Sequence, residues 1–172
     1  MKNNLYLLSI LLFFSIMSCQ RTVQTTYYIV RHGEKMDNSS NPALSEAGQQ
    51  RAQELKKLLA DKHISQVYST NYLRTSNTAK PLADAINVPV QTYDPKNQKA
   101  FIEDLKKIEG KNVLVVGHSN TITAIANGLY EKDTLQKELP EDDFDNLFIV
   151  KRQSLPSKKL QLTAKTYGKV TP

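Results

Sequence analysis

The sequence predicts an α/β fold of three layers, in which helices cover both faces of a mainly parallel central sheet. Short apolar runs rich in β-branched residues alternate along the chain with longer stretches whose apolar residues recur at helical spacing. One run, NVLVVG at residues 112–117, is typical of a parallel strand buried on both faces. A length of 172 residues suits one domain with a core of ordinary size. This alternation of strands and helices favours an α/β sandwich.

The individual elements follow from the same patterns. In chain order, we expect a strand at 26–30, a helix at 46–60, a strand at 65–69, a helix at 72–86, a strand at 88–93, a helix at 98–108, a strand at 112–117, a helix at 120–129, and strands at 146–152 and 159–167. Ser45 is suited to cap the first helix. Pro81 should kink the second helix, because proline lacks the amide hydrogen and crowds the carbonyl of Asn77.

The N-terminus is predicted to be an export signal followed by a short tether. Lys2 precedes an apolar run over residues 5–17 that is too short to span a bilayer comfortably. Cys19, the single cysteine, directly follows Ser18 in a stretch that resembles a bacterial lipobox. We therefore expect residues 1–18 to be a lipoprotein signal peptide, 19–25 a tether and 26–172 the folded domain.

This interpretation predicts where the folded domain is located. Acylated Cys19 would anchor the exported domain to the bacterial cell envelope, facing the periplasm or the cell surface. Two alternatives stay open, namely a membrane anchor that is never cleaved and an ordinary signal peptide with an incidental cysteine. A single cysteine leaves the domain without an internal disulfide, so packing alone must hold it.

The charge of the chain bears on its ligands. The formal net charge is +6, and it is +5 without residues 1–18, which contain Lys2 and no acidic residue. This modest excess suits an anionic small molecule. No dense Lys/Arg cluster interleaved with aromatic residues is present, so nucleic acid is not an expected partner.

Residues that can act in catalysis or in anion binding lie where the predicted strands end. The first strand runs into Arg31-His32-Gly33, Arg74 begins the helix after the second strand, and Gly117-His118-Ser119-Asn120 follows the strand at 112–117. Ligands of open α/β sheets bind outside the carboxyl ends of the strands. Guanidinium groups and a helix N-terminus suit a phosphoryl group, and a neutral imidazole can attack phosphorus. Two neighbouring arginines would repel a metal cation.

These motifs resemble those of the histidine phosphatase superfamily, whose fold is shared with cofactor-dependent phosphoglycerate mutases. The matching segments are RHGE at 31–34, LSEAGQQRA at 44–52, YSTNYLRTSNTA at 68–79 and VVGHSN at 115–120. The resemblance implies that His32 forms a phosphohistidine, while Arg31, Arg74 and His118 hold the phosphoryl oxygens, with no metal or cofactor. Asn38, at the spacing of an RHGExxxN pattern, would assist.

The resemblance leaves the proton donor open. Larger family members carry a glutamate soon after the third strand, where this chain has only the short stretch VQTYDPKNQKAF. Asp94 is the nearest substitute, and Glu34 is a second candidate. Glu34 is also a candidate substrate-binding residue, together with Asn38, Ser119 and Asn120.

The sequence therefore predicts a metal-independent phosphatase that hydrolyses phosphomonoesters through His32. Two alternatives use the same site, namely a phosphohistidine-protein phosphatase and a mutase-type phosphotransferase. The predicted export argues against both, because their usual partners and substrates are cytoplasmic. An alternative from another class is an inactive module that binds an anion or a partner, which the full set of pocket residues makes less attractive.

Overall fold

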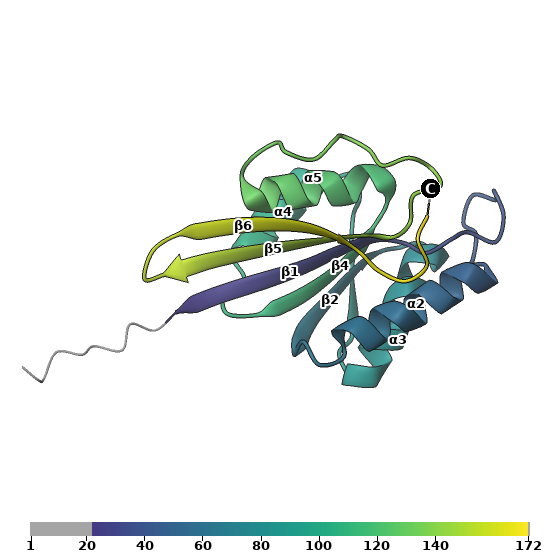
Figure 1. The fold of residues 1–172 in the computed structure, drawn as a ribbon, viewed down its shortest axis with the longest axis horizontal. Helices are drawn as coiled ribbons and strands as arrows, with labels where there is room; N and C mark the ends of the chain where they lie inside the picture. The colour runs from purple at the N-terminus through teal and green to yellow at the C-terminus, as the bar shows by residue number, and fades with distance from the viewer. Residues whose placement is uncertain (1–21, 172) are drawn as a thin grey trace, which may run out of the picture.

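The computed structural model describes residues 22–171 (Figure 1). Residues 1–18 and Cys19, on which the predictions of a signal peptide and a lipid anchor rest, lie outside the described residues. The elements are β1 (Val23–Arg31), α2 (Glu46–Leu59), β2 (Ile64–Thr70), α3 (Leu73–Ile86), β3 (Val90–Tyr93), α4 (Gln98–Lys106), β4 (Asn112–Gly117), α5 (Ser119–Tyr130), β5 (Asn146–Leu155) and β6 (Lys159–Thr166). Among residues 22–171, no helix has the length and apolar character that crossing a membrane requires.

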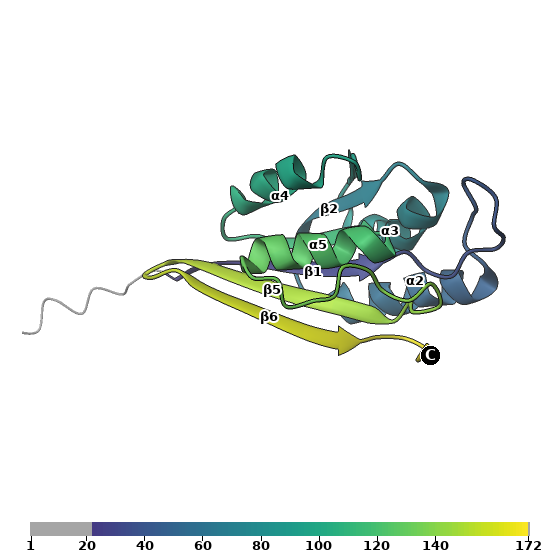
Figure 2. The ribbon, with the colours of Figure 1, turned by 90° about the horizontal axis from the view of Figure 1, so that it is seen from above.

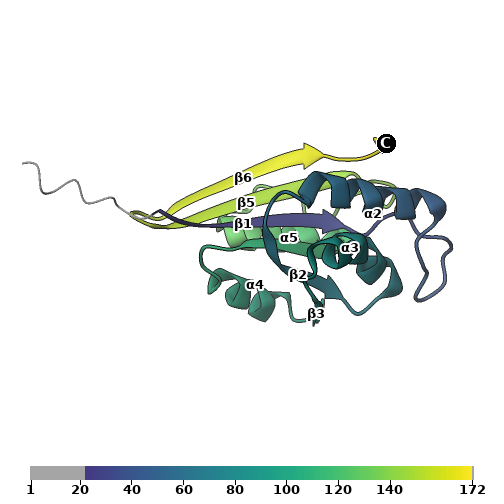
Figure 3. The same ribbon diagram turned by 90° about the horizontal axis from the view of Figure 1, so that it is seen from below.

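The strands form one mixed sheet of six, in the order β3-β2-β4-β1-β5-β6. The first four strands of this order are parallel, whereas β5 pairs antiparallel with β1 and β6 antiparallel with β5. Helices α4 and α5 cover one face (Figure 2), and α2 and α3 cover the other (Figure 3). The predicted three-layer α/β fold is confirmed, with an antiparallel hairpin added at one edge of the sheet.

Strand β4 shows how one strand serves two cores. Val113 and Val115 pack into the cluster with α4 and α5, whereas Leu114 and Val116 pack into the cluster with α2 and α3. Successive side chains of a strand point to opposite faces, so an apolar run is needed when both faces are covered. All four side chains are fully buried, which explains why this segment was the clearest strand in the sequence.

The start of β1 and the end of β5, at Leu155 instead of 152, differ most from the sequence prediction. Strand β1 begins at Val23, inside the segment expected to be a tether, because its first residues pair with β5, where Val23 faces Leu155. Helix α3 continues through Pro81 to Ile86, so the proline does not divide it into separate helices. The predicted cap of α2 is confirmed, since the Ser45 hydroxyl accepts a hydrogen bond from the Gly48 amide.

Four parallel strands bring their carboxyl ends to one edge of the sheet. Arg31 ends β1 beside Gly117 at the end of β4, and Thr70 ends β2. Helices α3 and α5 begin within a few residues of these ends. Segments far apart in sequence therefore meet at this edge.

Candidate active site

A cavity of about 410 Å³ lies at the carboxyl ends of β1, β2 and β4. Its lining contains the four residues that the sequence singled out most strongly, Arg31, His32, Arg74 and His118. Ser119 and Asn120, predicted as substrate-binding residues, also line it. The topology therefore assembles six of the predicted residues around one space.

His32 lies directly after β1 and is oriented by the backbone. Its side chain is buried, and its Nδ1 lies 2.8 Å from the carbonyl oxygen of Gly33. Because a carbonyl oxygen can only accept a hydrogen bond, Nδ1 carries the proton and donates it. Nε2 of the neutral ring therefore carries the free lone pair, which is the arrangement that nucleophilic attack requires.

His118, the N-cap residue of α5, is held by two partners. Its Nε2 lies 2.9 Å from the Thr70 hydroxyl, and its Nδ1 lies 3.4 Å from Nη2 of Arg74. Arginine can only donate, so Nδ1 accepts this long hydrogen bond and Nε2 carries the proton that Thr70 accepts. The His32 and His118 rings meet edge to face with their centroids 5.4 Å apart.

Both histidines are neutral at pH 7. Burial lowers the pKa of His32 to about 3, and the nearby charge of Arg31 acts in the same direction. Burial and the charge of Arg74 lower the pKa of His118 to about 4. A further positive charge beside two guanidinium groups is unfavourable, so both imidazoles stay neutral beside the two arginines.

Each arginine of the cavity stacks on an aromatic ring. The guanidinium carbon of Arg31 lies 4.3 Å from the ring centroid of Phe144, and that of Arg74 lies 4.5 Å from the centroid of Tyr72. Within residues 22–171, the Nε atoms of both arginines are buried and have no hydrogen-bond partner. A buried N–H without a partner is costly, and an anion that accepted from both would remove that cost.

The backbone at Gly33 is fixed by close contact with α2. A Cβ atom on Gly33 would lie 2.8 Å from the carbonyl oxygen of Gly48, and one on Gly48 would lie 2.3 Å from that of Glu34. The Gly33 amide also donates to the Thr78 hydroxyl at 2.9 Å. Two glycines thus allow α2 to pack against the turn that carries His32.

Three predicted residues lie away from this cavity. The Glu34 carboxylate pairs with Arg51, with Oε1 at 2.7 Å from Nη2. Asp94 is exposed and borders a different cavity, where its Oδ1 accepts a hydrogen bond from the Lys96 amide. Asn38 is exposed and is not among the residues that line the candidate site.

The different position of these residues has a physical reason. Asp94 closes its own turn with a local hydrogen bond, as aspartate before proline commonly does, and this bond turns its carboxylate away. Glu34 finds a buried cation on α2, and this partner determines its direction. Glu34 was a candidate because it follows His32 by two residues, and Asp94 because it follows the third strand. Neither position in the sequence reveals these partners.

The structure also adds residues that the sequence analysis did not identify. Glu141 and Lys35 line the cavity and form an ion pair at 2.7 Å. Phe144 supports Arg31, and Thr70 orients His118. Glu141 and Phe144 belong to the run PEDDF at 140–144 in the 131–145 loop, which lacks any periodic pattern and was not singled out in the sequence.

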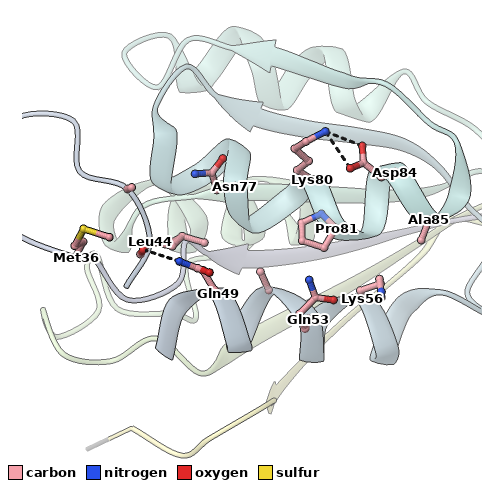
Figure 4. A pocket seen from close by; sticks show the side chains of 12 residues that line it. Met36, Leu44, Gln49, Gln53, Lys56, Asn77, Lys80, Pro81, Asp84 and Ala85 are labelled. Carbon is pink, nitrogen blue, oxygen red and sulfur yellow. Dashed lines mark hydrogen bonds and ion pairs between the residues drawn. The ribbon is translucent and has the colours of Figure 1, made fainter. Parts of the chain in front are cut away.

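A larger cavity of about 690 Å³ lies between α2 and α3 and contains none of the predicted catalytic residues (Figure 4). Gln49 and Gln53 of α2 face Asn77 and Pro81 of α3 across it. Size alone therefore does not identify the candidate site in this protein. Within residues 22–171, no group of three or more His, Cys, Asp or Glu side chains is placed to hold a metal ion.

Comparison with known proteins agrees with this geometry. Residues 27–95 match the profile of the family described as Histidine phosphatase superfamily (branch 1). This segment includes Arg31, His32 and Arg74, whereas His118 follows it in the chain. No curated protein matches the sequence.

Solved structures share the fold at low sequence identity. The protein histidine phosphatase SixA in complex with tungstate is 16% identical, with a TM-score of 0.62 over 82% of this chain and 96% of that one. A mycobacterial glucosyl-3-phosphoglycerate phosphatase is 12% identical, with a TM-score of 0.63 over 84% of this chain and 100% of that one. YhfR of Bacillus stearothermophilus is 16% identical, with a TM-score of 0.62 over 80% and 96%. These likenesses confirm the predicted phosphoglycerate mutase-like fold.

Proposed function

We propose that this chain, whose profile match and fold support membership of the histidine phosphatase superfamily, hydrolyses phosphomonoesters through a phosphohistidine on His32. One observation carries the proposal. Two neutral imidazoles share a cavity with two arginines whose buried Nε–H groups have no partner among residues 22–171. A phosphoryl group would satisfy those donors while presenting phosphorus to a nitrogen lone pair.

The first step is transfer of the phosphoryl group to His32. The Nε2 lone pair forms a bond to phosphorus as the ester P–O bond breaks, and the leaving oxygen takes a proton. The Nδ1–H of His32 stays hydrogen-bonded to the Gly33 carbonyl, which favours the imidazolium that forms. Arg31 and Arg74 hold the oxygens, and His118 would join them by giving its Nε2–H to an oxygen in place of Thr70. Positioning and electrostatics therefore supply most of the catalysis.

The second step is hydrolysis of the phosphohistidine. Water forms a bond to phosphorus, the P–N bond breaks, and the electron pair returns to Nε2 as phosphate leaves. The exposed residues Ser39, Ser40 and Lys96 border the cavity, so water has access. Water also supplies the leaving-group proton, because the lining acid, Glu141, is held as a carboxylate. The hydrogen bond from Lys35 and the charge of Arg31 lower its pKa below the ordinary value.

Replacing Arg74 with alanine should weaken the binding of inorganic phosphate. A hydrogen bond to a charged group contributes about 1.5–3 kcal/mol, which corresponds to a dissociation constant raised roughly ten- to 150-fold. Titration calorimetry with phosphate would measure this effect, and inhibition of p-nitrophenyl phosphate hydrolysis would test whether binding is competitive. Lys80→Ala, which removes an exposed cation from the same helix, is the matched control. An equal effect of both changes would rule out a specific anion site at Arg74.

We further propose that the domain is exported and anchored by lipid on Cys19, as the apolar run before Ser18-Cys19 indicates. Expression of the full chain in a bacterium with lipoprotein processing should yield a membrane-associated protein whose first residue is an acylated Cys19. Mass spectrometry of the N-terminal peptide measures this outcome. Cys19→Ala should release the protein from the membrane fraction. A wild-type chain that still begins at Met1 would contradict the proposal.

A further inference from the structure

Glu141 bridges two cations at the rim of the candidate site. Its Oε2 lies 2.9 Å from Nη2 of Arg31, and its Oε1 lies 2.7 Å from Nζ of Lys35. The residue belongs to the 131–145 loop, which runs back along α5 to the start of β5 (Figure 1). No step of the proposed chemistry uses the Glu141 carboxylate.

The contact occupies the part of Arg31 that a phosphoryl group would use. Nη1 of Arg31 donates to the carbonyl oxygens of Pro140 and Asp143, at 2.7 and 3.0 Å. This leaves the edge formed by Nε, which has no partner in the described part of the chain, and Nη2, which Glu141 holds. Arginine binds phosphate oxygens in pairs along such an edge. The Glu141 carboxylate therefore lies where a phosphoryl oxygen would accept a hydrogen bond.

The two partners differ in how firmly they are held. The Arg31 side chain is 2% exposed and is fixed by backbone carbonyls and by Phe144. The Glu141 side chain is 72% exposed, so solvent can replace its contact with Arg31 at low cost. An arriving phosphate would displace the carboxylate and leave the guanidinium in place.

Lys35 is the second partner of Glu141 and lines the same cavity. It can therefore hold the carboxylate after phosphate has displaced it from Arg31. While this pair persists, the positive charge of Lys35 is neutralised at the rim of the cavity. Without Glu141, Lys35 would attract a second anionic group on the substrate.

We propose that Glu141 determines the charge selectivity of the site: it competes with phosphate for Arg31, and by neutralising Lys35 it disfavours substrates with a second anionic group. The accepted class is then phosphomonoesters with neutral or cationic leaving groups. This inference rests on the proposed phosphatase function only for its turnover measurements, because its binding measurements do not depend on catalysis.

The binding experiment compares inorganic phosphate affinity in the wild type, Glu141→Gln and Glu103→Gln. The first variant should bind phosphate about fivefold more tightly, as expected for removal of one solvated unit charge a few ångströms away. The Glu103 variant makes the same charge change on α4, where the residue pairs with Lys106, and should leave the affinity unchanged. Unchanged or weaker binding in Glu141→Gln would overturn the competition.

The selectivity experiment uses two phosphomonoesters of similar size, 2-phosphoglycolate and O-phosphoethanolamine, whose second groups are a carboxylate and an ammonium group. In Glu141→Gln, kcat/KM for phosphoglycolate should rise about fivefold relative to that for phosphoethanolamine. An unchanged ratio would overturn the selectivity role. If no variant hydrolyses either compound or p-nitrophenyl phosphate, the proposed function fails. The dissociation constants of the two compounds, measured by competition with phosphate, then replace kcat/KM. Glu141→Gln should lower the constant of phosphoglycolate about fivefold relative to that of phosphoethanolamine, and an unchanged ratio would overturn the selectivity role.

Discussion

Replacement of His32 is expected to reduce hydrolysis of p-nitrophenyl phosphate by at least about 10³-fold, because loss of a covalent nucleophile removes the whole reaction path. Because His32 is buried, His32→Ala would open a cavity. His32→Asn retains a polar side chain and should be measured beside it, with circular dichroism as the check of folding. Rapid acid-free quenching after mixing with ³²P-labelled substrate should trap a labelled wild-type protein and leave both variants unlabelled.

His63 provides the control for this experiment. It is exposed between α2 and β2 and has a positive φ of 50°, a conformation that asparagine tolerates. His63→Asn should therefore keep full activity. Chelators should have no effect on the wild type, because no step of the proposed mechanism uses a metal. Substantial turnover in folded His32→Asn, or its loss from the wild type on chelation, would defeat the phosphohistidine mechanism.

The parts of the site that the sequence predicted all follow from local patterns and one topological rule. Strand β4 was visible because both of its faces are covered, and α2 because Ser45 caps an amphipathic repeat. Parallel strands bring their carboxyl ends to one edge. That rule was sufficient to bring His32 and His118 together from segments 86 positions apart.

The parts that the sequence did not predict depend on partners distant in the chain. Glu141 reaches Arg31 from a loop without periodicity, and nothing in PEDDF specifies where that loop lies. Asp94 was chosen for its position after the third strand, but a hydrogen bond within its own turn decides its direction. Helical spacing predicted where Arg51 lies on α2, but it could not identify Glu34 as its partner.

The second large expected effect is a loss of stability when the Glu34–Arg51 ion pair is broken. Arg51 is 1% exposed in its side chain and donates to Glu34, to the Tyr167 carbonyl and to the Lys169 carbonyl. It thereby ties the turn after His32 to α2 and to the end of the chain. Arg51→Met should lower the free energy of unfolding by about 3 kcal/mol, because it leaves a carboxylate and two carbonyl oxygens without their donor. Chemical denaturation measures the loss.

Matched variants distinguish the contribution of the Glu34–Arg51 ion pair to stability from the effect of a substitution elsewhere on α2. Glu34→Gln should also destabilise the protein, since it leaves the buried Arg51 charge uncompensated. The double variant should lose less than the sum of the single losses, as expected for residues in direct contact. Glu54→Gln removes a partly exposed acid, paired with Lys57, from the same helix and should change stability by less than about 0.5 kcal/mol. Additive losses would show that the pair is not coupled.

The pH dependence of the free energy of unfolding tests the same ion pair independently. Partial burial alone would raise the pKa of Glu34, but the hydrogen bonds from Arg51 outweigh it and lower that pKa below its ordinary value. In the unfolded chain this carboxylate has an ordinary pKa of about 4.3. Just below that pH, the unfolded chain therefore binds a proton while the folded state keeps the carboxylate ionised. The difference between wild type and Arg51→Met should be constant above about pH 5 and shrink as pH falls below about 4.3.

This pair also decides whether Glu34 can be the proton donor. A donor needs a raised pKa and contact with the leaving group, and Glu34 has a lowered pKa and a partner on α2. At a temperature where it is fully folded, Glu34→Gln should hydrolyse alkyl and nitrophenyl phosphates in the wild-type ratio. A selective loss of alkyl phosphate hydrolysis, without loss of stability, would restore Glu34 as the acid. The geometry instead assigns it to holding the His32 turn against α2.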